Sequence, residues 1–148
     1  MFAKGILVAA LMLGSSAVMA KTCDVELEAN DAMSFNTKEL KVDGDCTEAK
    51  LTLKHVGKMP KSAMGHNVVI TKTDDFKKVA KAAGKVSAED NYVPKDDARV
   101  LAHTKLFGGG ESDTITIPLD KFEKGGDYTF FCSFPGHWSV MKGKFVFG

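Results

Sequence analysis

The sequence lacks an excess of charge of either sign, which argues against one class of partner. Its 148 residues include 20 Lys+Arg and 19 Asp+Glu, and basic and acidic residues are interspersed along the chain. Proteins that bind nucleic acid cluster Lys and Arg on one surface, where these side chains neutralise phosphates. Attraction to a membrane surface needs a similar basic cluster. We therefore expect neither nucleic acid nor a membrane surface as a partner.

The sequence also lacks an apolar run long enough to span a bilayer comfortably. Near the N-terminus, the uncharged run Gly5–Leu13 follows Lys4, and small residues close the segment at 18–20. A basic start, an apolar run and a small-residue end are the three parts of a cleaved secretory signal. We predict a signal peptide over residues 1–20, no membrane anchor, and a single mature domain over residues 21–148. Cleavage would remove Lys4 and leave that domain with a formal charge of zero.

Cysteine is scarce, because the chain has only Cys23, Cys46 and Cys132. An exported chain meets oxidising conditions, in which cysteines pair. A bond between Cys23 and Cys46 would close a loop of about two dozen residues, for which the chain-entropy model gives roughly 3 kcal/mol. Arithmetic alone leaves the other two pairings open. If Cys23 and Cys46 pair, Cys132 is a free thiol, an intermolecular link or a ligand.

Internal repeats and low-complexity linkers are absent as well, so a second domain is not expected. Most of the mature chain consists of short segments rich in Val, Ile, Thr and Phe, separated by turn residues, and this pattern predicts strands. The expected strands are 25–30, 51–55, 66–72, 98–105, 113–119, 127–133 and 143–148. Many short strands in fewer than about 130 residues predict an all-β fold, a Greek-key β-sandwich.

One segment, residues 73–84, breaks the strand pattern and predicts a short helical insertion. Its apolar residues recur at the spacing of one helical face. These residues are Phe76, Val79, Ala80 and Ala83. Thr73 or Asp74 is the expected N-cap, and Gly84 is expected to end the helix.

The stretch FCSFPGHWSVM, residues 131–141, brings together three side chains that can bind a metal. It contains a thiol (Cys132), an imidazole (His137) and a thioether (Met141) within ten positions. Pro135-Gly136 predicts a turn between the first two, which would fold all three side chains toward one point. A thiolate, an imidazole and a thioether suit copper, and Cu(I) in particular, better than Mg, Ca or Mn.

A further strong ligand would have to come from elsewhere in the chain. The best donor is His66 in the run Met64-Gly65-His66-Asn67, which we expect to open a strand and in which Gly65 would let the backbone approach closely. Two imidazoles and one thiolate with a weak axial thioether form a blue-copper electron-transfer site. Four alternatives remain open: plain packing of Cys132 and Met141, a Cys–His nucleophile and base, a zinc site, and a copper-delivery site.

Several blocks of the sequence resemble the azurins, the blue-copper proteins of the cupredoxin family. They are CSFPGHWSVMKG, MGHN and KDDARVLAHTKLFGGGE, together with the two N-terminal cysteines. Four residues separate Cys132 from His137 and three separate His137 from Met141, whereas the related plastocyanins, pseudoazurins and amicyanins have a shorter Cys-to-His step. Dinuclear copper domains have two cysteines in this loop, and this chain has one. The resemblance covers nearly all of residues 21–148.

The resemblance implies a periplasmic one-electron carrier with one copper ion per chain and no enzymatic activity. It makes His66, Cys132 and His137 the three equatorial ligands. Met141 becomes the axial thioether, and the Gly65 carbonyl becomes the opposite, weaker axial oxygen. The family also has a disulfide at the position of the first two cysteines.

The resemblance further assigns roles around the metal. Asn67 would hold the two ligand segments together, and the backbone amides of Asn67 and Phe134 would donate to the sulfur. Electrons would pass through His137, whose ring edge would reach the surface inside an apolar patch. The matching patch residues are Met33, Met64, Phe134, Pro135 and Trp138, with Met59 and Ala63 at the rim.

An apolar patch of this kind suits brief docking through adaptable contacts. The expected partners are redox proteins such as c-type cytochromes and reductases, and the protein itself is expected to be a monomer. We interpret His55 and His103 as structural histidines, although family position makes His55 a candidate for protonation linked to the redox state.

Overall fold

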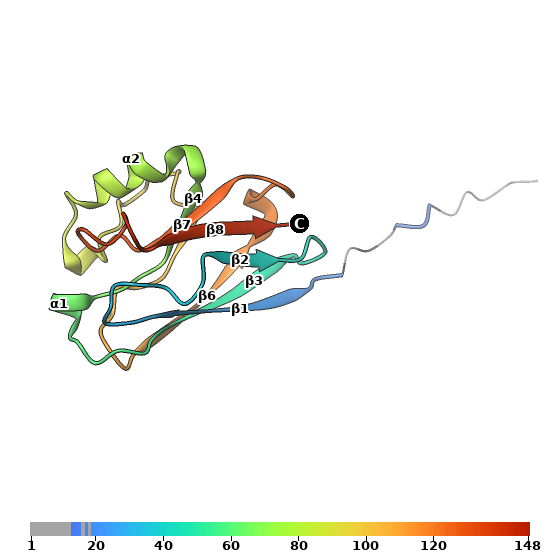
Figure 1. Ribbon diagram of the computed structural model, residues 1–148. Coiled ribbons are helices and arrows are strands. Elements are labelled where there is room, and N and C mark those ends of the chain that lie inside the picture. Colours follow the sequence, from blue (N-terminus) through green and yellow to red (C-terminus); the bar gives the residue numbers. More distant parts are fainter. Residues whose placement is uncertain (1–12, 16, 18) are drawn as a thin grey trace, which may run out of the picture.

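The computed structural model describes residues 13–15, 17 and 19–148. Most of the predicted signal peptide, residues 1–20, therefore lies outside the described residues. From Thr22 onward the chain forms two β-sheets, with one longer helix outside them (Figure 1). Within the described part, no helix has the length and apolar character needed to cross a membrane.

The two sheets differ in size and mix parallel with antiparallel pairs. The smaller sheet has the order β1 (Thr22–Ala29), β3 (Glu48–His55), β6 (Ser112–Pro118). The larger has the order β2 (Glu39–Val42), β8 (Lys142–Phe147), β7 (Tyr128–Phe131), β4 (Val69–Lys72), β5 (Ala102–His103). The pairs β1–β3 and β2–β8 are parallel and the others are antiparallel. The predicted all-β sandwich is confirmed.

The main core fills the space between the sheets because successive side chains of a strand point to opposite faces. In β3, the inward-facing Leu51 and Leu53 are fully buried, whereas Lys50, which faces outward, is exposed. In β8, Phe145 and Phe147 are buried in the same way. Complete burial of such a side chain contributes about 1.5–3 kcal/mol, so this core holds the two sheets together.

The predicted helix is α2 (Thr73–Ala83), which lies on the outer face of the larger sheet (Figure 1). All four residues predicted for its inner face are buried. The predicted cap was wrong, because the N-cap is Lys72 and no side chain caps the helix. The Thr73 hydroxyl instead bonds to Asp127 and to Thr129, at 2.8 Å each, and so ties the start of the helix to the neighbouring strand.

Two strand predictions need correction. The strand expected at 66–72 begins only at Val69, because the short helix α1 (Lys61–Met64) ends directly before Gly65. His66 forms an isolated bridge with Phe107 instead. The strand expected at 98–105 shrinks to Ala102–His103. On either side of this strand, the Leu101 amide still donates to the Ile70 carbonyl of β4, and the Thr104 amide donates to the Val68 carbonyl. The ladder does not extend beyond these two bonds.

The disulfide between Cys23 and Cys46 is confirmed, with the two Cα atoms 6.0 Å apart. It ties the beginning of β1 to the turn that precedes β3, and the two strands then run side by side in parallel. Among the described residues, Cys132 is the only free cysteine.

Replacing both Cys23 and Cys46 by serine should lower the free energy of unfolding of the copper-free protein by about 3 kcal/mol, because the unfolded chain gains the freedom of an open loop. Urea denaturation followed by circular dichroism measures this loss. Wild-type protein unfolded in the presence of a reductant serves as the control and should lose the same amount. An unchanged midpoint in both samples would contradict the prediction.

Candidate metal centre

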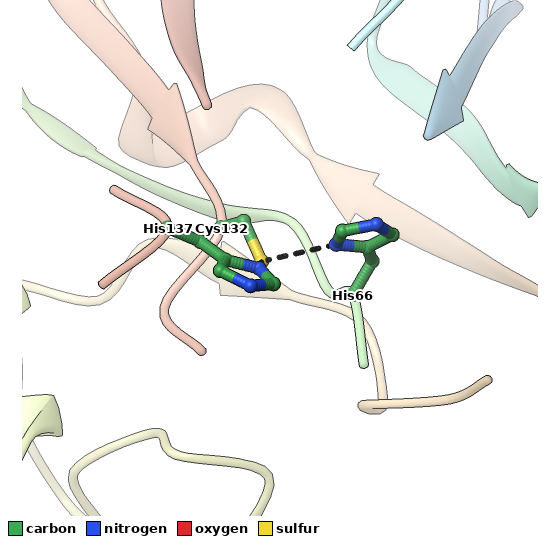
Figure 2. A group of neighbouring side chains, drawn as sticks. All are labelled: His66, Cys132 and His137. Atoms are coloured by element: carbon green, nitrogen blue, oxygen red, sulfur yellow. Dashed lines mark hydrogen bonds between the residues drawn. The ribbon is translucent and has the colours of Figure 1, made fainter. Parts of the chain in front are cut away.

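Three buried side chains from two distant parts of the chain meet at one end of the sandwich. The ligand atoms of His66, Cys132 and His137 all lie within 4.8 Å of one another. The Cys132 Sγ lies 3.8 Å from Nδ1 of His66 and 3.6 Å from Nδ1 of His137. Figure 2 shows both rings close to the sulfur. Exposure is 0 % for His66 and Cys132 and 2 % for His137, so bulk water is nearly excluded.

The loop after β7 bends as its sequence predicts. The amide of His137 donates to the carbonyl of Phe134 at 2.9 Å, which closes a four-residue turn. Pro135 occupies the second position, where its fixed φ is favourable, and Gly136 occupies the third position with a φ of 83°. These are the residue preferences of a type II turn. The turn reverses the chain and brings His137 back over Cys132.

Met141 lies beside Cys132 because a second turn follows the first. The Met141 amide donates to the His137 carbonyl at 2.8 Å, and the Cys132 amide donates to the Met141 carbonyl at 3.0 Å. Met141 is fully buried in the main core. The two backbone bonds therefore place the backbone of Met141 beside that of Cys132.

Gly65 approaches the site through its backbone. Its carbonyl oxygen lies 4.0 Å from the Cys132 sulfur. A Cβ atom at this position would lie 2.6 Å from the Lys61 carbonyl oxygen and 3.2 Å from the Phe134 ring, closer than such atoms pack. The expected close approach at Gly65 is confirmed, and it explains why α1 must end with a residue that has no side chain.

His66 is held from both its backbone and its ring. Its amide and carbonyl bond reciprocally with Phe107, at 3.0 and 3.1 Å. Its Nε2 lies 2.7 Å from the Asn30 carbonyl oxygen, which can only accept a hydrogen bond. Nε2 therefore carries the hydrogen, and the lone pair of Nδ1 faces the sulfur. Asn30 could not be predicted from the sequence, because its backbone carbonyl accepts the bond and any residue type has such a carbonyl.

Hydrogen bonds of the Asn67 side chain connect the His66 segment to the loop after Cys132. The Ser133 amide donates to Asn67 Oδ1 at 2.8 Å. Asn67 Nδ2 in turn donates to the Ser133 hydroxyl at 2.8 Å and to the Asn91 carbonyl at 2.9 Å. Ser133 and Asn91 were not predicted. The position of Ser133 directly after Cys132 was a usable signal, whereas Asn91 acts through its backbone.

The protonation states of the three side chains follow from their burial. Burial raises the pKa of the Cys132 thiol to about 12, although the backbone amides of Asn67 and Phe134 partly oppose this shift. Burial, together with the nearby His66, lowers the pKa of His137 to about 4. Burial also lowers the pKa of His66. Near pH 7 the copper-free site therefore holds two neutral imidazoles and one protonated thiol.

This donor set fits a metal cation. Two imidazole nitrogens face one sulfur, and a thiol has only one hydrogen with which to satisfy them. Two nitrogens and a thiolate suit copper or zinc rather than Mg or Ca. A cysteine nucleophile, by contrast, needs a lowered pKa and access to substrate, and Cys132 has a raised pKa and no exposed surface. The geometry therefore favours a metal site over a hydrolytic one.

The residues predicted for the docking patch lie around this end of the molecule with different exposures. Pro135 is exposed, whereas Met33, Met64 and Phe134 are half-buried. Trp138 is half-buried because its ring packs edge-on against Phe76 of α2, with 5.7 Å between centroids. The rim residues Met59 and Ala63 are exposed. Val140, which sequence reasoning did not include, is 52 % exposed.

His55 lies directly behind His66, with 4.5 Å between the ring centroids. The Gly57 amide donates to its Nδ1 at 3.1 Å, and its Nε2 lies 2.8 Å from the Met64 carbonyl. An imidazole that accepts at one nitrogen and donates at the other is neutral. His55 thus supports the carbonyl of the residue before Gly65. His103, by contrast, is exposed, and its Nδ1 lies within hydrogen-bond distance, 2.9 Å, of the Thr104 carbonyl oxygen.

Comparisons with known proteins agree with this geometry. The sequence model of "copper binding proteins, plastocyanin/azurin family" matches residues 21–148. An azurin of Alcaligenes faecalis is 52% identical over 126 residues, which cover 85% of this chain and 98% of the relative. An azurin of Achromobacter denitrificans is 48% identical over 143 residues, which cover 97% of this chain and 96% of the relative.

The fold is also similar to that of a solved azurin structure. The azurin Az-iso2 from the methylotroph Methylomonas sp. strain J superposes with a TM-score of 0.82 at 36% sequence identity. The superposition covers 85% of this chain and 98% of that one.

Binding of Cu(II) to the copper-free protein at pH 7 should release about one proton per ion, because only the thiol must lose a proton. The number should stay near one from pH 7 up toward the pKa of Cys132, about 12. It should rise as the pH falls and His66 and then His137, whose pKa is about 4, become protonated. The pH change in weak buffer measures the release. Two or more protons at pH 7 would show that the histidines are charged before binding.

Asn67→Ala should lower the free energy of unfolding by about 2–3 kcal/mol, because it leaves the buried Ser133 amide and Asn91 carbonyl without partners. Asn36→Ala is the matched control, since it removes one exposed acceptor from the Glu28 amide and should cost less than about 1 kcal/mol. Denaturation of the copper-free proteins measures both. Equal losses in the two variants would mean that Asn67 does not hold the loops together.

Proposed function

The chain belongs to the plastocyanin/azurin family of copper-binding proteins and is an electron carrier rather than an enzyme; we propose that His66, Cys132 and His137 hold its copper ion. The observation that supports this assignment most strongly is the convergence of two imidazole nitrogens and one sulfur in a site from which water is almost excluded. A bound copper ion supplies the Cu(I)/Cu(II) couple.

Met141 and the Gly65 carbonyl complete the proposed ligand set as weak axial groups. The burial of Met141 and its backbone bonds to Cys132 and His137 support the first assignment. The 4.0 Å between the Gly65 oxygen and the Cys132 sulfur supports the second. Every ligand lies on a segment held by backbone or Asn67 hydrogen bonds, so the site stays rigid when its charge changes. Rigidity suits a carrier, since little must rearrange during transfer.

The backbone amides of Asn67 and Phe134 are proposed to donate to the thiolate sulfur in the loaded site. Both amides lower the pKa of Cys132, which supports this assignment because a donor to the sulfur favours its negative charge. Such contacts stabilise the thiolate and help to set the reduction potential.

Electrons are proposed to enter and leave through His137. Nε2 of His137 has no hydrogen-bond partner within the protein. Among the described residues, every fully buried side-chain nitrogen or oxygen does have such a partner. Nε2 of His137 is therefore not fully buried and reaches the surface. The surrounding apolar residues are the proposed docking patch. They are Met33, Met64, Phe134, Pro135 and Trp138. Its proposed partners are c-type cytochromes and reductases, met by a monomer of this chain.

The periplasm is the proposed location. Residues 1–20 have the layout of a secretory signal, whose removal would leave the domain 21–148. The disulfide between Cys23 and Cys46 agrees with an oxidising compartment.

The purified protein with one equivalent of Cu(II) should absorb visible light strongly, because electrons of the Cys132 thiolate are excited toward the metal. Cys132→Ser should abolish this absorption, and His137→Ala should change or weaken it. His103→Ala is the matched control, because this histidine is exposed and lies outside the cluster. Its visible spectrum should equal that of the wild type. A colourless wild-type protein would reject the blue-copper assignment.

A further inference from the structure

A groove of about 370 Å³ lies between α2 and β8, lined by residues of both elements and of β7. Its borders are the side chains of Lys38, Lys142 and Lys144, and its floor includes Phe76 and Thr129. The backbone of the groove is fixed, because the Lys144 amide donates to the Lys38 carbonyl at 2.8 Å. The electron-carrier function does not by itself account for a preformed groove with this lining.

The three lysines carry charges that the fold leaves uncompensated. All three are exposed, and none forms an ion pair within residues 13–15, 17 and 19–148. Glu39 stands opposite Lys144 in the strand register but makes no ion pair with it. Asp127 is engaged by the Thr73 hydroxyl at 2.8 Å. The groove therefore carries three ammonium groups that have no carboxylate within ion-pair distance.

The floor of the groove is apolar and well ordered. The Phe76 ring is buried against Phe131, with 4.8 Å between centroids. The ammonium group of Lys142 lies 5.6 Å from the centre of the Phe76 ring, where the face of the ring attracts a cation. Thr73 and Thr129 satisfy each other with a hydrogen bond of 2.8 Å. Positive borders over an apolar floor match a segment that alternates carboxylates with aliphatic chain.

Packed aromatic rings connect the groove to the surroundings of His137. Phe76, on its floor, touches Trp138, and Trp138 directly follows His137. Val140, half of whose surface is exposed, lies between Trp138 and Lys142 in the sequence. A protein that covers the apolar residues around His137 therefore reaches the lysines without leaving the interface.

We propose that this lysine groove binds an acidic segment of the redox partner protein and so orients the partner's centre toward His137. The proposal rests on the electron-carrier function proposed above and adds the charge of the partner. No bond forms or breaks on docking. One electron passes between the redox centres of the two proteins. The centre that gives up the electron is oxidised, and the centre that accepts it is reduced. Carboxylates supply the opposite charge that the three lysines lack.

The kinetic test uses hexacyanoferrate(III), a trivalent anion, to oxidise the reduced copper-loaded protein in a stopped-flow instrument. The double variant Lys142→Glu/Lys144→Glu should react about 10-fold more slowly than the wild type at low ionic strength, because it loses the attraction between the lysines and the anion in the encounter complex. The difference should disappear in high salt, which screens that attraction. Lys142→Gln/Lys144→Gln should show a smaller loss. An unchanged visible spectrum shows that each variant folds and holds its metal.

The matched control is Lys50→Glu/Lys121→Glu, which makes the same change in net charge at exposed lysines of β3 and the 119–121 turn. This variant should slow the reaction only slightly. Equal slowing by the two glutamate pairs would mean that net charge alone governs the rate, and would overturn the proposal.

A binding test needs no electron transfer and separates this proposal from the function on which it rests. Hexaglutamate peptide is titrated into the protein with its copper reduced, and backbone amide shifts are followed by NMR. The shifts should concentrate at Thr73, Thr129 and Gly143 and should vanish in Lys142→Glu/Lys144→Glu. Shifts spread evenly over all exposed lysines would overturn the docking site while leaving the copper assignment intact.

Discussion

The hydrogen bonds between Asn67 and Ser133 are the interaction on which the site depends. They join the segment that carries His66 to the loop that carries Cys132 and His137, two parts of the chain 66 residues apart. Without them, the β4–β7 ladder would still pair Val69 with Phe131, but the loops beyond the ladder, which carry the imidazole and the sulfur, would lose the side-chain bonds between them. Because Asn67 also bonds to the Asn91 carbonyl, a third segment, the loop after α2, is fixed by the same side chain.

Burial then decides which charge the site prefers. Two neutral imidazoles and one thiolate contribute a single negative charge, so the loaded site is neutral with a monovalent ion and carries one positive charge with a divalent ion. A site from which water is excluded penalises the charged form. The burial that raises the pKa of Cys132 and lowers that of His137 therefore also favours the reduced state. The amides directed at the sulfur act in the same direction, because they draw electron density away from the metal.

The parts of the structure that sequence could predict are those with local causes. Pro135-Gly136 sets its own turn, and the inner face of α2 follows from the spacing of four apolar residues. The errors come from distant partners. Thr73 was expected to cap the helix, but its hydroxyl bonds instead to Asp127 and Thr129, which lie more than fifty positions away in the sequence. The Asn30 carbonyl that orients His66 could not be predicted either, because every residue has a backbone carbonyl and the sequence does not indicate which one will contact the ring.

The charge arrangement explains why an almost neutral protein can still orient a partner. A formal net charge of +1 produces little long-range field. At 10 Å in water, one lysine and one carboxylate attract each other by only about 0.4 kcal/mol, and salt screens the attraction over about 8–10 Å. Three lysines that share one groove add their contributions at short range, whereas Lys21, Lys54 and Lys95 are compensated by carboxylates. The proposed groove therefore acts after contact, by favouring one orientation over others, and the proposed apolar docking patch around His137 would supply attraction that has no preferred direction.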